Sequence, residues 1–312
     1  PGRFGTFLAG FFAVALILAL GFMGCMVQSN SIGETCAAAF GVPSWSVGIV
    51  VAVLAAVVFL GGIQRIAGVT EKLVPIMAAL YLLGGLVVLV CRVRYLPEAV
   101  GMIFRYAFVP NAIIGGSLGY ALKMAVSQGV KRGLFSNEAG MGSTPHAHAM
   151  AKVEKPQDQG VVAMVCVFID TFVVLTITAL VMITSGALNV GDMAANPAAE
   201  NMAQVAFSTV FGSFGNFYVA ICLLFFAFST IIGWYFFGEQ NIKYLFGTKG
   251  TTPYRLIVMG FIVLGSVLQV DLVWELADMF NGLMVLPNLI ALIGLSKIVS
   301  MALRDYDANN PR

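Results

Sequence analysis

The sequence predicts an all-α membrane protein, and three observations lead to that prediction. Of its 312 residues 59% are hydrophobic and 10% are charged, whereas about a quarter of the residues of ordinary soluble domains are charged. Uncharged runs of 18 or more residues recur along the chain, and each is long enough to cross a bilayer as a helix. The runs are apolar on every face rather than alternating, which excludes a closed β-barrel. The 17 Lys and Arg residues are scattered and the net charge is +2, so nucleic acid is excluded as a partner.

Eight segments are expected to be membrane helices. They lie at about 6–27, 46–63, 72–91, 110–128, 160–186, 204–237, 253–270 and 272–300. We expect residues 1–312 to form a single transmembrane domain, because the spans follow one another closely. The chain begins with Pro1 and enters an apolar run by Thr6, so we also expect further segments to precede it.

The distribution of Lys and Arg predicts that both ends of the chain are cytoplasmic. With the N-terminus inside, the inner loops hold thirteen basic residues, including Lys131 and Arg132, and the outer loops hold Arg92, Arg94 and Arg105. Cytoplasmic loops carry the excess of Lys and Arg in membrane proteins.

The fourth segment is rich in glycine. Gly115, Gly116 and Gly119 stand where the other spans place Leu and Val. The 115/119 spacing favours close packing of two helices, and the alternative is a helix that unwinds and offers its backbone to a substrate.

Polar side chains at membrane depth are the second group of candidates, because burying them unpaired costs several kcal/mol. Gln28 and Asn30 lie in a polar run near the end of the first span. Ser229 and Thr230 lie in the sixth span, and Trp234 follows one turn later. Hydroxyls such as these often bond only to their own helix.

Asp170 lies near the middle of the fifth span. A carboxylate at that depth is either a functional group, for example a proton carrier, or an acceptor that ties its helix to a neighbour. The sequence leaves both interpretations open.

The loop between the fourth and fifth spans reads GVKRGLFSNEAGMGSTPHAH from 129 to 148. It matches neither the Walker motif nor the dinucleotide-binding motif. Ser136, Asn137 and Glu138 are typical of a helix N-terminus. His146 and His148 lack a third ligand, so a metal site is not expected.

This loop resembles the signature of the sodium:alanine/glycine symporter family. Four other stretches share the resemblance: CMVQSNSIG at 25–33, VFIDT at 167–171, FAFSTIIGWYFFG at 226–238 and WELADMFNGLMVLPNLIAL at 274–292. The likeness extends over essentially the whole chain. It implies the ten-helix inverted-repeat core of LeuT-like transporters, in which the eight spans would be core helices three to ten. An extra N-terminal helix and core helices one and two would precede them.

The resemblance also implies roles for the candidates. The span with Gly115, Gly116 and Gly119 would be the discontinuous core helix six, which favours the unwound alternative. Ser229 and Thr230 would supply hydroxyls to a sodium ion. Gln28, Asn30 and Trp234 would face the bound amino acid. Cys25 departs from the Asn usual in the family, which puts substrate identity or affinity in doubt.

The function that follows is sodium-coupled uptake of a small neutral amino acid, such as alanine or glycine, by alternating access across a bacterial inner membrane. Na⁺ would be the coupling ion, and neither an organic cofactor nor an obligate protein partner is expected. The nearest alternative is a transporter of the same architecture driven by protons, with Asp170 as the proton carrier. A membrane hydrolase or transferase is the third possibility, and it lacks a nucleophile and base at suitable depth.

Overall fold

The computed structural model describes residues 2–108, 118–187 and 201–309, and within these ranges it contains helices and no strands. The first part of the chain forms α1 (Arg3–Leu16), the π-helical η1 (Ile17–Gly24), α2 (Cys25–Phe40), α3 (Ser44–Leu60), α4 (Gly62–Cys91), the short η2 (Val93–Tyr95) and α5 (Leu96–Phe108). The middle forms α6 (Leu118–Asn137), α7 (Pro145–His148), α8 (Pro156–Phe168), the π-helical η3 (Ile169–Val174) and α9 (Leu175–Thr184). The last part forms α10 (Met202–Phe211), α11 (Phe214–Phe246), η6 (Thr248–Gly250), α12 (Thr251–Gly265) and α13 (Val270–Asn309).

Five helices of the described ranges are long and apolar enough to cross a membrane. They are Arg3–Phe40, Gly62–Cys91, Pro156–Thr184, Phe214–Phe246 and Asp271–Ala308. Each contains most of one predicted segment, so the all-helical membrane class is confirmed. The predicted segments at 46–63 and 253–270 form the shorter helices α3 and α12. The count of eight spans and the ten-helix core stay predictions.

Three expectations about boundaries are wrong. The first span continues through η1 and α2 to Phe40, so the polar run lies inside a helix and not at its end. The segment 204–237 is two helices, because Gly212 takes a φ of 60° and a ψ of −145°, a conformation open to glycine. Lys131 and Arg132 belong to α6 and not to a loop. The orientation of the ends stays a prediction.

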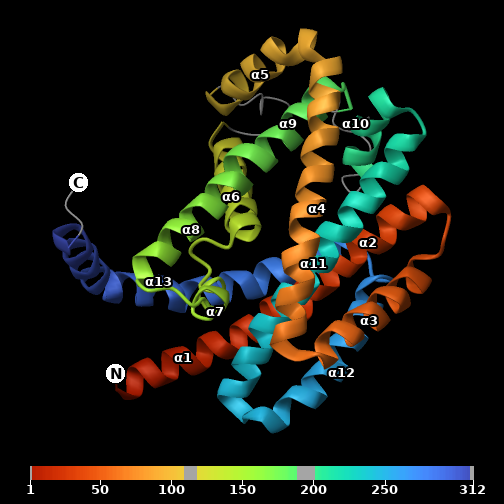
Figure 1. Ribbon diagram of the computed structural model, residues 1–312. Coiled ribbons are helices and arrows are strands. Elements are labelled where there is room, and N and C mark those ends of the chain that lie inside the picture. The colour runs from red at the N-terminus through yellow and green to blue at the C-terminus, as the bar shows by residue number, and fades with distance from the viewer. Residues whose placement is uncertain (1, 109–117, 188–200, 310–312) are drawn as a thin grey trace.

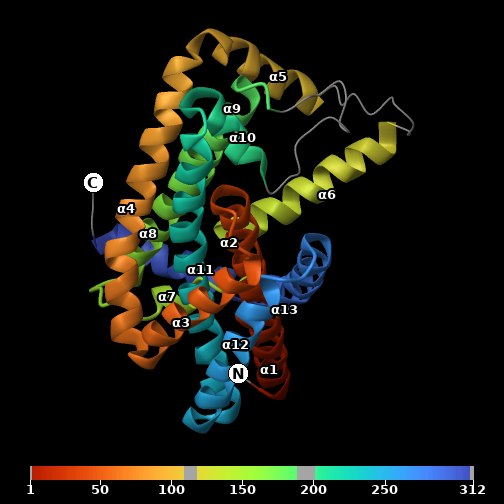
Figure 2. The same cartoon turned by 90° about the vertical axis from the view of Figure 1, so that its right-hand side faces the viewer.

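The most densely packed part of the molecule is formed by α2, α3, α11 and α12 (Figure 1). Glycines allow close approach here: a Cβ on Gly238 would collide with the Tyr254 hydroxyl and lie 3.3 Å from the Cα of Gly21. Small residues at helix crossings allow such contact between backbones in membrane proteins. In Figure 2, by contrast, α6 leans out from these helices.

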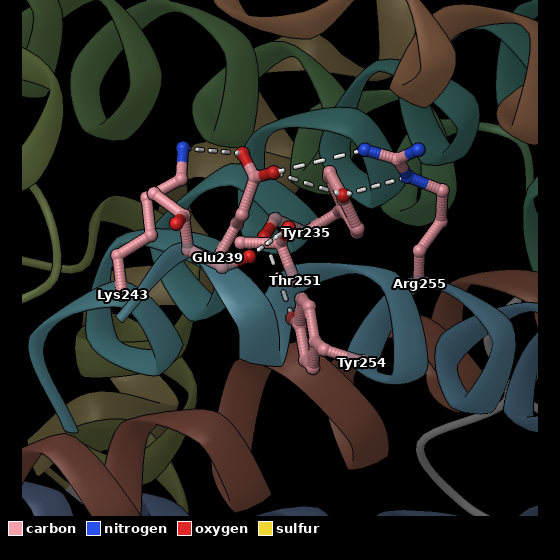
Figure 3. A network of polar contacts seen from close by, with 7 residues as sticks. Tyr235, Glu239, Lys243, Thr251, Tyr254 and Arg255 are labelled. Atoms are coloured by element: carbon pink, nitrogen blue, oxygen red, sulfur yellow. Dashed lines mark hydrogen bonds and ion pairs between the residues drawn. The ribbon is translucent and has the colours of Figure 1, made fainter. Parts of the chain in front are cut away.

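A buried acid joins α11 to α12 at one end of this packed group (Figure 3). Glu239 is 5% exposed and forms ion pairs with Lys243 at 3.3 Å and Arg255 at 3.9 Å. The Tyr235 hydroxyl donates to Glu239 and accepts from the Arg255 Nε, each at 3.3 Å. At the opposite end of α12, Asn30 of α2 donates to the carbonyls of Gly265 and Leu268, both at 2.9 Å.

Candidate functional site

The candidate site is built around the end of α6. The helix stops at Asn137, and a loop of seven residues leads to α7 at Pro145. Within it Glu138, Gly140 and Gly142 have φ values of 54°, 91° and 86°, so the chain cannot continue as a right-handed helix. Interrupted helices expose backbone amides and carbonyls, which transporters use to bind ions and substrates.

Side chains from two long helices hold this loop in place. Asn288 of α13 donates to the Gly140 carbonyl at 2.7 Å. Asn241 of α11 lies 2.9 Å from the Nε2 of His146, whose Nδ1 lies 2.9 Å from the Ser143 carbonyl. The loop is therefore fixed inside the bundle by groups that the sequence scatters over 150 residues.

Glu138 is the central acid of the loop. Its carboxylate accepts hydrogen bonds from the Trp234 indole N–H and from the Ser143 hydroxyl. Burial raises the pKa of the Glu138 carboxyl above its ordinary value, and the two donated bonds act in the opposite direction. Glu138 thus links α11 to the break after α6.

An aromatic wall stands beside Glu138. Phe135 meets Trp234 edge-on, with 5.3 Å between ring centroids, and its ring centroid lies 5.2 Å from that of Trp274 of α13. Trp234 also packs on Gly24, where a Cβ would lie 2.5 Å from the indole ring. Gln28 is half-buried one turn after Gly24, on the same helix face. The structure therefore brings Trp234, Phe135 and Glu138 together, with Gln28 one turn away.

Cys25 follows Gly24 and is fully buried. Its thiol lies 3.9 Å from the Ile231 carbonyl of α11, a long contact for a weak donor. Cys25 therefore stands at the contact between α2 and α11, next to the glycine that receives Trp234. Its effect on substrate choice stays a prediction.

Asn30 has a different environment. Its amide donates to the carbonyls of Gly265, the last residue of α12, and of Leu268 just after it, and the neighbouring Ser29 hydroxyl donates to the Ile262 carbonyl at 2.6 Å. These bonds join α2 to α12 and occupy the amide group of Asn30. Its predicted contact with a substrate stays a prediction.

Ser229 and Thr230 both donate to the Phe226 carbonyl of their own helix, at 2.9 Å. The Ser229 hydroxyl also lies 3.4 Å from the Met77 sulfur of α4. A hydroxyl that donates one hydrogen bond keeps lone pairs that a cation can use. The geometry is therefore compatible with the predicted sodium ligands, and that role stays a prediction.

The glycine-rich stretch is only partly within the described residues. Gly115 and Gly116 lie outside them, and Gly119 lies in the first turn of α6, where the helix is regular. Ser136 and Asn137 are the last residues of α6, so the prediction that they begin a helix is wrong. Pro145 begins the next helix instead. Residues 129–148 were expected to form a loop, but α6 continues through Asn137, and the irregular backbone begins only near Gly140 and Gly142, which take left-handed conformations.

Asp170 lies in η3 and accepts a hydrogen bond from the Ser136 hydroxyl at 2.8 Å. Asn137 donates to the neighbouring Thr171 hydroxyl at 3.3 Å. The side chains of Ser136, Asn137 and Asp170 border a cavity of about 560 Å³. Asp170 thus ties the fifth predicted span to the end of α6, while its role with protons stays a prediction.

A comparison with protein families decides which class of protein carries this arrangement. The model of the family described as "Sodium:alanine symporter family" matches residues 3–312 of this chain. The chain belongs to the sodium:alanine symporter family. This family consists of transporters and not of enzymes, which excludes the hydrolase or transferase alternative. The family and the five apolar helices together make the chain an integral membrane protein.

Three relatives illustrate the likeness. An uncharacterized transporter of Haemophilus influenzae is 39% identical over 96% of this chain and 65% of its own length. A sodium/alanine symporter of Methanococcus maripaludis is 42% identical over 89% and 60%, respectively. A probable sodium/glutamine symporter of Bacillus subtilis is 38% identical over 96% and 61%. The chain spans less than two thirds of the length of each of these relatives.

Proposed function

We propose that the protein carries a small neutral amino acid, such as alanine or glycine, across the plasma membrane together with sodium. The observation that carries the proposal is the break after α6, held by α11 and α13 and bordered by Trp234. An interrupted helix among packed membrane helices offers backbone amides and carbonyls to a zwitterion. The names of relatives support sodium and alanine, and one relative named for glutamine shows that substrate differs among them.

In this proposal the aromatic rings of Phe135 and Trp234 surround the substrate's small side chain, and Gln28 contributes polar contacts. Ser229 and Thr230 hold the sodium ion; they lie five and four residues before Trp234 on α11. Sodium and substrate then favour one conformation together, which is the coupling that symport requires. No covalent step and no organic cofactor take part.

The architecture proposed is the LeuT-like ten-helix core, with residues 1–312 as one transmembrane domain and both chain ends cytoplasmic. The stops in α6 and between α10 and α11 fit a core with interrupted helices. Alternating access would then move α6 and its loop relative to the packed group of α2, α3, α11 and α12.

The experiment that tests the function is uptake of radiolabelled alanine and glycine into proteoliposomes containing the full-length protein. Sodium and proton gradients are imposed separately. Accumulation driven by sodium alone supports the proposal. Accumulation driven by protons without sodium supports the alternative with Asp170 as carrier, which the relatives named as sodium/proton-dependent alanine carriers keep in view.

The sodium ligands are tested in the same vesicles. Replacing both Ser229 and Thr230 with Ala is expected to raise the sodium concentration for half-maximal uptake at least tenfold. Ser296 and Ser300 are the matched control, because each also donates to a carbonyl of its own helix but on the exposed face of α13. Equal sodium dependence in the two double variants would refute the assignment.

A further inference from the structure

The loop after α6 is attached to α11 at two points on one face of that helix. Trp234 donates to Glu138, the first residue of the loop, and Asn241 contacts His146 of α7, just after the loop ends. The two residues of α11 are seven positions apart, which is two turns or about 10.5 Å along the axis. Residues at this spacing project from the same face of a helix. The loop is therefore held at both of its ends by α11.

Hydrogen bonds inside the loop connect the two attachments. The Ser143 hydroxyl donates to the Glu138 carboxylate, and the Ser143 carbonyl lies 2.9 Å from the Nδ1 of His146. Ser143 is fully buried, and Glu138 and His146 are half-buried. We call the connected side chains the loop network; its members, in order, are Trp234, Glu138, Ser143, His146 and Asn241.

The partners of His146 determine which of its nitrogens carries hydrogen. The Ser143 carbonyl can only accept, so Nδ1 donates to it. The Asn241 amide nitrogen can only donate, and it lies 2.9 Å from Nε2, so Nε2 accepts. The orientation of this amide is fixed in turn, because the same nitrogen donates to the Phe237 carbonyl at 2.8 Å. His146 is therefore a neutral imidazole with its hydrogen on Nδ1.

A second proton on His146 would find no acceptor in the loop network. It would occupy Nε2 and face the amide N–H of Asn241, so that two donors meet. Turning the amide over would offer its oxygen to this proton, but the oxygen would then face the carbonyl of Phe237. Histidine is the side chain that ordinarily changes charge between about pH 5 and pH 8. The loop network is thus complete only while His146 is neutral.

The other groups around His146 offer its imidazolium form no described ion pair. The rings of Phe12 in α1 and Phe237 in α11 pack on it, with centroids 6.2 and 6.0 Å away, and neither ring titrates. Glu138 is the titratable member of the loop network, and it is linked to His146 through one residue. Glu239 is two residues from Phe237, so it projects from the opposite side of α11.

We infer that His146 is a positioning residue of the transporter, which in its neutral form completes the loop network and so keeps Glu138 beside Trp234 in the candidate site. Protonation of His146 separates the loop from Asn241, and uptake of the amino acid falls. This inference rests on the proposed transport function.

The test is the pH profile of sodium-driven alanine uptake in proteoliposomes containing the full-length protein, with equal pH on both sides. Wild-type uptake should fall about tenfold from pH 8 to pH 5.5, the size expected when a hydrogen bond is replaced by an unpaired donor. His146→Gln should show no such fall, because its amide offers an oxygen to Asn241 and an N–H to Ser143 but takes up no proton in this range. His148→Gln is the matched control: it lies in the same short helix, contacts Gln159 instead, and should keep the wild-type profile.

A second variant separates the hydrogen bonds of His146 from its ring packing. His146→Phe keeps an aromatic ring against Phe12 and Phe237 but can neither accept from Asn241 nor donate to Ser143. Its uptake at pH 8 should already be as low as that of the wild type at pH 5.5, and it should not change with pH. Uptake by His146→Phe with the wild-type profile would overturn the inference.

Nitrogen NMR of the wild type with labelled histidine decides the matter without a variant that must transport. The resonances that disappear in His146→Phe should show a protonated Nδ1 and an unprotonated Nε2 at pH 8, and the opposite tautomer would overturn the inference. Sodium-driven uptake with the same fall in the wild type and in His146→Gln would overturn this inference alone. Absence of sodium-driven uptake in the wild type at pH 8 would overturn the proposed function as well.

Discussion

The two π-helical stretches, η1 and η3, each interrupt a long membrane helix, but they differ in burial. Six of the eight residues of η1 are buried, whereas no residue of η3 is. In η1, Gly24 receives the indole ring of Trp234. In η3, Asp170 presents a carboxylate to the end of α6. π-Helical turns are frequent at functional sites, and the comparison shows that one can fix a site by packing while another positions a polar group beside it.

The largest effect is expected from breaking the packed stretch at Gly24. A Cβ there would lie 2.5 and 2.8 Å from two carbons of the Trp234 ring, so Gly24→Ala should reduce the free energy of unfolding by about 1–3 kcal/mol. Gly233→Ala is the control, because nothing lies within 4 Å of its Cβ position; it should be neutral or slightly stabilising. Thermal unfolding in detergent measures both. Equal midpoints for the two variants would contradict the proposed packing.

The next effect concerns the hydrogen bond from the Trp234 indole to Glu138 of the loop after α6. Trp234→Phe keeps an aromatic ring against Phe135 but leaves the Glu138 carboxylate without its indole donor. We expect the free energy of unfolding to fall by about 1–3 kcal/mol. The alanine concentration for half-maximal uptake should rise about tenfold, equivalent to 1.4 kcal/mol. Trp45→Phe on the exposed surface should change neither quantity. An unchanged uptake curve for Trp234→Phe would remove Trp234 from the site.

A smaller effect is expected from the charge of Glu138. Because burial raises its pKa, the folded protein holds the proton more tightly than the unfolded chain does. The free energy of unfolding should therefore fall as the pH rises from the unfolded pKa through the folded one. Glu138→Gln keeps an acceptor for Trp234 and should remove that fall. Unfolding midpoints between pH 4 and pH 8 test this, and a parallel pH dependence in the two proteins would show that another group is responsible.

The smallest effect on stability is expected in η3. Asp170→Asn retains an oxygen that accepts from Ser136, so the free energy of unfolding should change by no more than about 0.5 kcal/mol. Sodium-driven alanine uptake should persist. Asp158→Asn, in the first turn of α8, provides a control on the same long helix. If Asp170→Asn folds normally but loses all uptake, η3 carries the coupling group and the proton-driven alternative gains support.

The helical class and most of the long spans could be predicted from the sequence, because an uncharged run of 18 residues in a bilayer is stable only as a helix. The sequence was insufficient where single residues decide. The break at Gly212 and the end of α6 at Asn137 depend on left-handed or otherwise glycine-favouring backbone inside apolar sequence. The amphipathic α5 was missed because Glu98 and Arg105 interrupt its apolar residues, so that stretch had been assigned to a loop.

The candidate site was foreseen in part. Trp234 was among the predicted residues, and its role with a substrate stays a prediction, as does that of Gln28; Glu138 was interpreted as a capping residue and Phe135 was not considered. Their proximity to Trp234 depends on contacts about a hundred residues apart in the chain. The hydrogen bonds from Asn30 to the carbonyls of Gly265 and Leu268 could not be predicted either, because the sequence does not indicate which backbone carbonyl a polar side chain in a span will contact.

The fastening of α12 at its two ends has a mechanical consequence. Near its start, Arg255 belongs to the charged group around Glu239, and near its end two carbonyls accept from Asn30. Sliding α12 by one turn would separate both attachments at once and leave a buried acid short of a counterion. During a transport cycle α2, α11 and α12 should therefore move together as one rigid unit.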